Sequence, residues 1–193
     1  AEDGGHRKFI MVQLPEKTDE KKEAYKAGYK NICEIGKERI RRAGKKVKEE
    51  AGLQGQDLDI GFRVLKLDSS NMEDVYYTPD DLTEQTLFNS VDNVKPDRTP
   101  LDLLFQVLPE LNIELSARIE EKEVHGKKVF MVNGDQLIAT FDTDVNESTI
   151  TEIAKLRPIY FVMRDASAEN DNVLDNFEQI FKHYSPDTIR RIL

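Results

Sequence analysis

Two apolar segments on either side of a long helical pattern constrain the first third of this chain more than any other feature. Residues 9–12 are continuously apolar, as in a strand covered on both faces, and residues 60–67 alternate in part. Between them, apolar side chains recur every three or four residues, which predicts one amphipathic helix over residues 19–50. A strand, a helix and a strand form a βαβ unit with a parallel strand pair and a right-handed crossover.

The remaining sequence predicts a second, smaller unit. We expect helices over residues 80–94, 101–111, 149–156 and 172–184, and strands over residues 118–124, 129–132, 137–141 and 159–163. Residues 95–100 are rich in helix breakers and mark the expected domain boundary. Thr99-Pro100 opens the second of these helices, Thr149 and Glu152 form a capping-box pattern, and Asn133-Gly134 predicts a hairpin. The expected fold class is α/β, with a partial Rossmann-like unit over residues 1–94 and a small mixed α/β domain over residues 95–193.

Charge and composition exclude several classes of protein. The chain has 193 residues, with 28 basic against 37 acidic side chains and a net charge of −9, which excludes a protein that is basic throughout. No apolar run approaches the roughly 18 residues of a membrane span, and residues 1–5 lack the features of a signal peptide. A single cysteine, Cys33, excludes a disulfide framework and fits a reducing compartment, so we expect a cytoplasmic protein. A chain that begins with Ala is expected to be a processed or truncated product.

No motif for a self-contained active site occurs in the sequence. The three histidines have no metal-ligand spacing, and no phosphate-binding loop or nucleophile elbow is present. Residues 142–146 imitate the start of a calcium loop, but Glu147 stands where glycine is required and Ile153 where glutamate is required. We therefore expect a polar turn that caps the next helix, and no metal. Cys33 is interpreted as a packing residue rather than a nucleophile.

A basic stretch inside the predicted long helix is a candidate nucleic-acid contact. Residues 37–50 contain seven basic and three acidic side chains in a chain that is acidic as a whole. A cluster of cations on one helix face can neutralise phosphates, and the candidates are Arg41, Arg42 and Lys45. The alternative is a solvated helix face held by neighbouring glutamate–lysine pairs.

Polar residues follow both predicted strands of the βαβ unit. Gln13 and Glu16 come after the first strand, and Asp68 follows the second. Ligands in open α/β sheets bind outside the carboxyl ends of strands, where such side chains can accept hydrogen bonds from a ribose or an adenine amino group. The alternative is that Glu16 and Asp68 are loop and cap residues.

Several separated segments resemble one family in that family's order. These segments are residues 3–16, 25–42, 61–71, 92–104 and 164–182. They resemble modification subunits of type III restriction–modification systems, which are adenine-specific DNA methyltransferases of the β arrangement. The resemblance covers nearly the whole chain. It implies transfer of a methyl group from S-adenosylmethionine to the exocyclic amino group of an adenine flipped out of the duplex.

The family's two diagnostic motifs are absent. The chain contains neither Asp-Pro-Pro-Tyr nor the Phe-x-Gly-x-Gly cofactor loop, and it lacks the target-recognition region between them. The resemblance therefore implies the C-terminal part of a larger methyltransferase, inactive alone and without a catalytic residue of its own. Many relatives hold the cofactor ribose with an acid where this chain has Gln13, with Glu16 three residues on. Asp68 matches a position near the cofactor adenine. The implied partners are DNA, the restriction subunit and a second modification subunit.

Two alternatives remain at the level of sequence. One is a non-catalytic module that dimerises modification subunits or contacts the restriction subunit. The other is an unrelated acidic, soluble α/β domain. An exposed apolar face where further strands should pack would favour the methyltransferase fragment, whereas a closed polar surface with a two-fold contact would favour the module.

Overall fold

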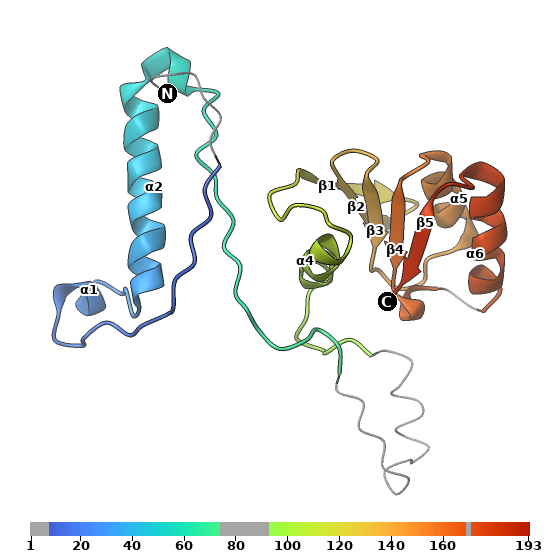
Figure 1. The fold of residues 1–193 in the computed structure, drawn as a ribbon, viewed down its shortest axis with the longest axis horizontal. Helices are drawn as coiled ribbons and strands as arrows, with labels where there is room; N and C mark the ends of the chain where they lie inside the picture. Colours follow the sequence, from blue (N-terminus) through green and yellow to red (C-terminus); the bar gives the residue numbers. More distant parts are fainter. Residues whose placement is uncertain (1–7, 74–92, 169–170) are drawn as a thin grey trace, which may run out of the picture. The chain divides into compact units, whose positions relative to one another are not determined.

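The chain folds as two compact units, residues 1–65 and residues 66–193. The computed structural model describes residues 8–73, 93–168 and 171–193 (Figure 1). The division predicted between residues 94 and 95 separates a methyltransferase part from an extension, and it stays a prediction. The helix predicted over residues 80–94 lies outside the described residues except for its last two positions.

Unit 1 contains a broken helix where one continuous helix was predicted. The helical elements are α1 (Glu23–Lys26), α2 (Ile32–Glu50) and the 3-10 helix η1 (Gly52–Gly55). The prediction of a single helix over residues 19–50 is wrong, because Gly28 takes a φ of 96° that helical residues do not adopt. Asn31 then starts α2 afresh, since its side chain accepts a hydrogen bond from the Glu34 amide at 3.0 Å.

The two apolar segments that flank α2 are not strands. The structure assigns no β-ladder to residues 9–12 or to residues 60–67, so the predicted strand–helix–strand unit does not form in this chain. Ile10 is 93% exposed and Val12 is 94% exposed. A strand exists only where a neighbour accepts its backbone hydrogen bonds, and the described part of unit 1 supplies none at these positions.

Unit 2 is a mixed α/β fold, which confirms the predicted class. Its elements are α4 (Pro100–Glu110), β1 (Ile119–Val124), β2 (Lys127–Val132), β3 (Leu137–Thr140), α5 (Glu147–Lys155), β4 (Tyr160–Met163), η3 (Asp165–Ser167), α6 (Asp171–Tyr184) and β5 (Ile189–Ile192). The strands form one sheet in the order β1-β2-β3-β4-β5. The first three strands are antiparallel, and β3, β4 and β5 run parallel to one another. Each parallel pair is joined by a helix, as parallel pairing requires.

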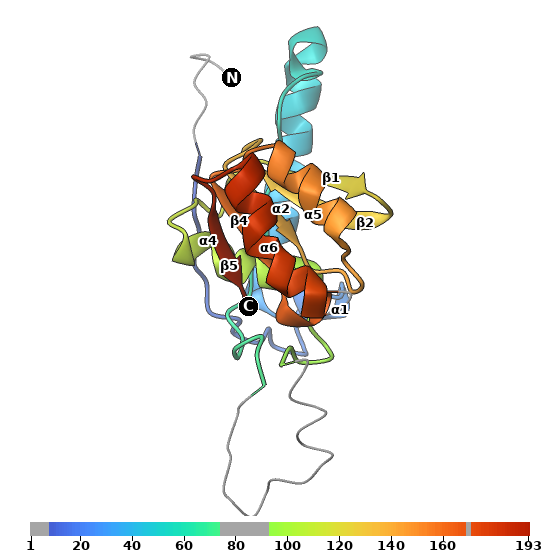
Figure 2. The same cartoon turned by 90° about the vertical axis from the view of Figure 1, so that its right-hand side faces the viewer.

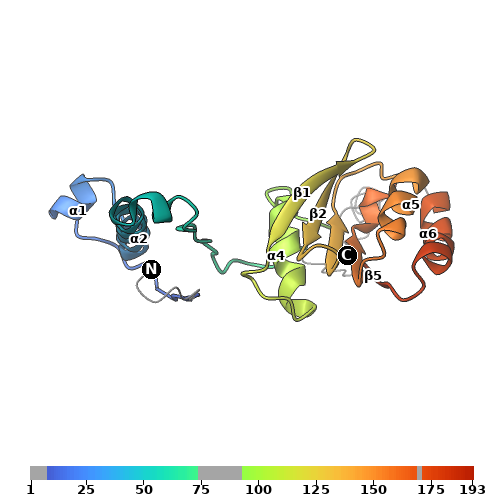
Figure 3. The same ribbon diagram turned by 90° about the horizontal axis from the view of Figure 1, so that it is seen from above.

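Helices cover both faces of this sheet. Figure 3 shows α4 on one side of the strands and α5 with α6 on the other, and Figure 2 shows α5 and α6 side by side. Alternate side chains of each strand enter opposite layers. Val162 packs in the cluster with α4, whereas Phe161 and Met163 pack in the cluster with α5 and α6. A three-layer arrangement buries both faces, which explains why the central strands β3 and β4 are mostly apolar.

Turn residues set the antiparallel part of the sheet. His125 and Gly126 join β1 to β2 with φ values of 50° and 77°, the pair of positive angles that a type I′ turn requires. Asn133 and Gly134 open the connection from β2 to β3 with φ values of 48° and 77°, which confirms the predicted hairpin. The four strands predicted in this region are confirmed within about two residues at their ends.

The N-caps of α4 and α5 agree only in part with the predicted ones. Thr99 and Pro100 open α4 as predicted, with a reciprocal capping box between Thr99 and Asp102. The box predicted at Thr149 is wrong, because Asn146 caps α5 three residues earlier by accepting from the Thr149 amide at 3.0 Å. The prediction that residues 142–146 form a polar capping turn is thereby confirmed.

One strand was not predicted. β5 has the sequence Ile-Arg-Arg-Ile, and its two central arginines give no period-2 apolar pattern in so short a segment. It forms because it lies parallel to β4, with the Ile189 amide donating to the Ile159 carbonyl and the Leu193 amide donating to that of Met163.

Candidate functional site

The two cofactor candidates of unit 1 lie on the extended segment before α1. Gln13 and Glu16 are both exposed. The side-chain Nε2 of Gln13 donates to the Leu14 backbone carbonyl at 3.1 Å. The backbone carbonyl of Gln13 accepts from the Cys33 thiol at 3.5 Å. The Glu16 carbonyl accepts from the Ile32 amide at 3.0 Å, so this residue ties the segment to the start of α2.

The third cofactor candidate, Asp68, belongs to unit 2 and forms part of a loop anchor. Its carboxylate lies 3.7 Å from the Arg98 guanidinium, which also pairs with Asp97 at 3.1 Å. Arg98 and Lys95 both donate to the Ser69 hydroxyl, at 3.0 and 3.1 Å. These contacts hold the loop after residue 67 against the joint before α4. Asp68 therefore helps to anchor this loop through Arg98, and its role in cofactor binding stays a prediction.

Arg98 is a residue whose importance was missed in the sequence, where the joint was interpreted only as a set of breakers. Its side chain is 11% exposed, although it lies in a loop. Its Nε is buried without a hydrogen-bond partner among the described residues. A nearly buried arginine requires paired charge, and Asp68 and Asp97 supply it. Its position between two Pro residues gave no pattern that predicts burial.

The three DNA candidates lie on α2 with exposed side chains. Each cation has a carboxylate one helical turn away: Arg41 and Arg42 approach Glu38 at 4.0 and 2.7 Å, and Lys45 approaches Glu49 at 3.9 Å. The hydrogen bond from Arg42 to Glu38, with the negative charge of that carboxylate, raises the pKa of Arg42 further above its ordinary value. These i,i+3 and i,i+4 pairs match the alternative of a solvated, internally paired face.

One face of α2 is covered by the segment that follows η1. The Arg41 guanidinium lies 5.7 Å from the centre of the Phe62 ring, in a cation–π contact. A side chain at Gly44 would meet the Cβ of Ile60 at 3.1 Å, so glycine allows this close approach. The α2 helix nevertheless has no buried residue, and Ile32 and Val47 remain about 40% exposed. Cys33 is half-buried at the start of this helix.

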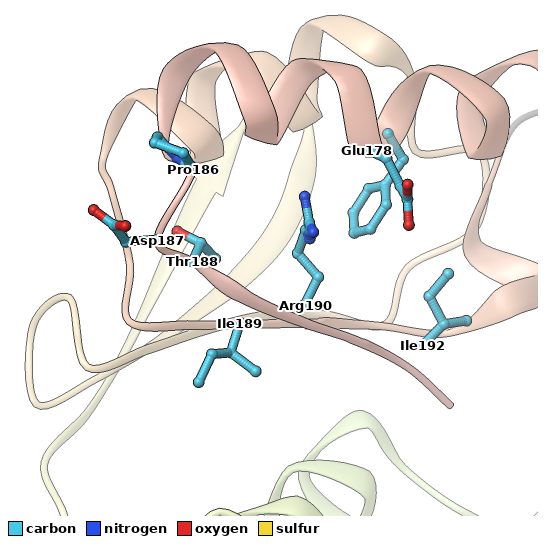
Figure 4. A pocket seen from close by; sticks show the side chains of 8 residues that line it. Glu178, Pro186, Asp187, Thr188, Ile189, Arg190 and Ile192 are labelled. Carbon is cyan, nitrogen blue, oxygen red and sulfur yellow. The ribbon is translucent and has the colours of Figure 1, made fainter.

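A groove that was not predicted lies on unit 2, between α6 and β5. It has a volume of about 730 Å³ and is lined by Phe177, Glu178, Pro186, Asp187, Thr188, Ile189, Arg190 and Ile192 (Figure 4). In Figure 4 the Arg190 side chain points from β5 toward α6, and the Ile189 side chain points to the opposite face of the sheet. None of the six residues singled out in the sequence lines this groove.

The described ranges offer neither a metal centre nor a membrane-crossing helix. They contain no group of three or more His, Cys, Asp or Glu side chains placed to hold a metal ion. No helix in these ranges combines the length and the apolar character that crossing a bilayer requires.

Comparison with known proteins leaves the family open. The chain matches none of the protein-family models and none of the curated proteins with which it was compared.

Proposed function

We propose that this chain is the C-terminal part of an adenine-specific DNA methyltransferase of a type III restriction–modification system. The parent enzyme would transfer a methyl group from S-adenosylmethionine to the exocyclic amino group of adenine. The proposal rests on the family resemblance of the separated sequence segments. The structural observation that carries it is the exposure of apolar segments that have the composition of buried strands.

The exposed segments of unit 1 have the character of an incomplete sheet. Phe9, Ile10, Met11 and Val12 are all more than half exposed, and Val64 and Leu65 in the second segment are each 50% exposed. Contiguous apolar surface of this kind is uncommon on a complete soluble domain and marks a contact surface. Neighbouring strands of a methyltransferase sheet would bury these side chains and pair the backbone. This is the outcome expected for a fragment rather than for a closed module.

The three cofactor candidates belong to different units of the chain. Gln13 and Glu16 offer exposed acceptors in unit 1, and Asp68 is held by Arg98 in unit 2. The Phe-x-Gly-x-Gly cofactor loop of the family is absent from this sequence, so the groups that would complete a nucleoside site are not supplied by these three residues. We therefore place cofactor binding in the longer protein, where Gln13 or Glu16 would accept hydrogen bonds from the ribose and Asp68 would lie near the adenine. No catalytic residue is assigned here.

The decisive experiment compares this chain with the native protein in its source cells. An antibody raised against the 193 residues is used to detect and purify the native polypeptide. Hydrogen exchange is then measured on both proteins by mass spectrometry. We expect a product several hundred residues longer, in which residues 9–12 and 60–67 exchange slowly, whereas they exchange fast in the isolated chain. Strands β2 and β3 serve as the internal control, because they are protected in both proteins.

Activity provides the second readout of the same experiment. The native protein should incorporate tritiated methyl groups from S-adenosylmethionine into adenine of duplex DNA, and the isolated chain should not. A native product of 22.2 kDa would contradict the proposal, as would methyl transfer by the isolated chain. Fast exchange of residues 9–12 in a longer native protein would contradict the structural argument.

The DNA-contact role of α2 has its own test in the native enzyme. Replacing Arg41, Arg42 and Lys45 by alanine should lower DNA affinity. It should also reduce the slope of log affinity against log salt concentration by the amount expected for about three phosphate contacts. Replacing Lys26, an exposed cation on α1, is the matched control. Unchanged affinity and salt dependence in the triple variant would leave α2 as a solvated face.

The subunit-contact module is the second candidate, and unit 2 favours it. This unit buries both faces of its sheet, so it is complete as a fold, yet it leaves a strand edge beside a groove. Contact with a second modification subunit or with the restriction subunit is compatible with the first proposal, because the two units can serve different tasks in one protein.

A further inference from the structure

We propose that the free edge of β5 binds an extended segment of a partner protein whose side chains alternate between acidic and apolar. The segment would add a strand to the sheet and place an acidic side chain in the groove between β5 and α6. The inference concerns the contact surface of unit 2 and does not require the methyltransferase proposal to be correct.

The backbone of β5 is open on its outer side. Ile189 and Leu193 donate their amides to β4. Because successive residues of a strand direct their backbone groups to opposite sides, the N–H and C=O groups of Arg190 and Ile192 face away from β4. No described residue hydrogen-bonds to these groups. An unpaired edge of this kind is the template that extended peptides use when they add to a sheet.

The groove beside this edge has a cation in its wall. Arg190 is half-buried and points toward α6 (Figure 4). Among the described residues its guanidinium has no ion-pair partner, whereas Arg191 on the other face pairs with Glu110 at 2.6 Å. The groove lining mixes polar and apolar side chains: Phe177 is buried, whereas Glu178 and Asp187 are exposed acids at its surface. A carboxylate that enters the groove beside β5 would meet the half-buried guanidinium of Arg190, which can donate charge-assisted hydrogen bonds to it.

The opposite face of β5 accounts for the apolar positions of the partner segment. Ile189 is 55% exposed and points away from the groove. A side chain beside it on an added strand would be apolar, one position along from the acidic one. Alternation of acidic and apolar residues follows from the period of two along a strand.

The charges of β5 disfavour a symmetric dimer formed through this edge. In an antiparallel pairing of two β5 strands about their centres, Arg190 or Arg191 lies directly opposite its own copy, and like charges so placed are destabilising. The other sheet edge, β1, has the sequence Ile-Glu-Glu-Lys-Glu-Val. Pairing β1 of one copy with β5 of the next would match charges, but this contact is heterologous and leads to open chains of copies or to rings.

The test titrates the 193-residue chain with two capped, fluorescently labelled nonapeptides. One alternates valine and glutamate, and the other alternates valine and lysine. We expect the glutamate peptide to bind at least about tenfold more tightly, with amide shifts in the NMR spectrum confined to β5 and α6. Replacing Arg190 by glutamate should reverse this preference.

A matched pair of variants separates backbone pairing from side-chain contact. Ile192→Pro removes an N–H that the sheet does not use, whereas Ile192→Ala keeps that N–H and loses the same side chain. We expect the proline variant to bind the glutamate peptide at least about tenfold more weakly than the alanine variant, with the circular dichroism of both unchanged. If Ile192→Pro fails to fold, the peptide preference of the Arg190→Glu variant still tests the proposal.

Three results would overturn the proposal. The first is equal affinity for the two peptides, and the second is equal binding by the two variants at residue 192. The third is a chain that is already oligomeric at micromolar concentration and dissociates when Arg190 is replaced by glutamate, because a second copy would then occupy the edge. None of these results bears on DNA methylation, so a failure here is distinguishable from a failure of the proposed function.

Discussion

Two four-residue segments of nearly the same composition have opposite fates in this protein. Residues 9–12 read Phe-Ile-Met-Val, and β4 reads Tyr-Phe-Val-Met over residues 160–163. In β4 the last three side chains are fully buried, with Phe161 stacked on Phe181 at 5.0 Å between ring centres. In the first segment every side chain is more than half exposed. The difference lies in the neighbours, because β4 has a strand on each side and helices on both faces.

An apolar run therefore encodes a tendency to be buried rather than a strand. β4 satisfies that tendency within unit 2, where β3 and β5 pair with it. The same tendency in residues 9–12 is unsatisfied in the described part of unit 1. Partners outside this chain would satisfy it under either the methyltransferase proposal or a subunit contact.

Truncating a core side chain in each segment gives the largest contrast. Phe161→Ala should lower the free energy of unfolding of unit 2 by about 3–5 kcal/mol, because it leaves a cavity beside Phe177 and Phe181. Ile10→Ala should change stability by less than about 0.5 kcal/mol, since that side chain is already in solvent. Urea unfolding followed by circular dichroism measures both. A comparable loss in the two variants would mean that residues 9–12 are buried in solution.

Removing a helix cap should have a smaller effect that depends on the unit. Asn146→Ala should lower the stability of unit 2 by about 1 kcal/mol, because the amide of Thr149 loses its acceptor in a packed helix. Asn31→Ala should reduce the helix signal of α2 and leave the cooperative transition of unit 2 in place. The Asn→Asp variants, which keep an acceptor, are the controls. A shift of that transition by Asn31→Ala would show that the units unfold together.

Lowering the pH should reduce the free energy of unfolding through the start of α4, by less than either of the preceding substitutions in unit 2. The hydrogen bonds from the Thr99 hydroxyl and amide hold the pKa of Asp102 below its ordinary value. A carboxylate with a lowered pKa in the folded state stabilises the fold above its unfolded pKa, and this contribution is lost as the pH falls through the folded pKa. Because Asp102 is exposed, we expect about 1 kcal/mol or less.

The measurement for this prediction is the free energy of unfolding between pH 6 and pH 2. Asp102→Asn should flatten the acid-side slope relative to the unaltered chain. Asp135→Asn, which changes an exposed carboxylate in the β2–β3 connection, serves as the control. An equal change in slope from both variants would mean that the capping contact at Thr99 contributes nothing specific to the pH dependence.

Local chemistry was enough to predict much of unit 2 from the sequence. Asn133-Gly134 and the Thr99-Pro100 helix start depend only on backbone angles and on hydrogen bonds to near neighbours, and both were predicted correctly. The cap at Asn146 was predicted only as a polar turn, because Thr149 offered a second cap in the same stretch. For the candidate site, the sequence identified Gln13, Glu16 and Asp68 by their positions after apolar runs, but it gave no sign of the Arg98 anchor.

Turns, caps and apolar runs can be predicted from the sequence, because they depend on residues within one or two helical turns of each other. Which of the apolar runs become strands depends on tertiary contacts. β5 forms despite its arginines because β4 accepts its hydrogen bonds, and residues 9–12 stay exposed despite their apolar side chains because the described residues provide no such partner. Backbone pairing between distant segments depends on which neighbour is present, and a single strand's sequence does not contain that information.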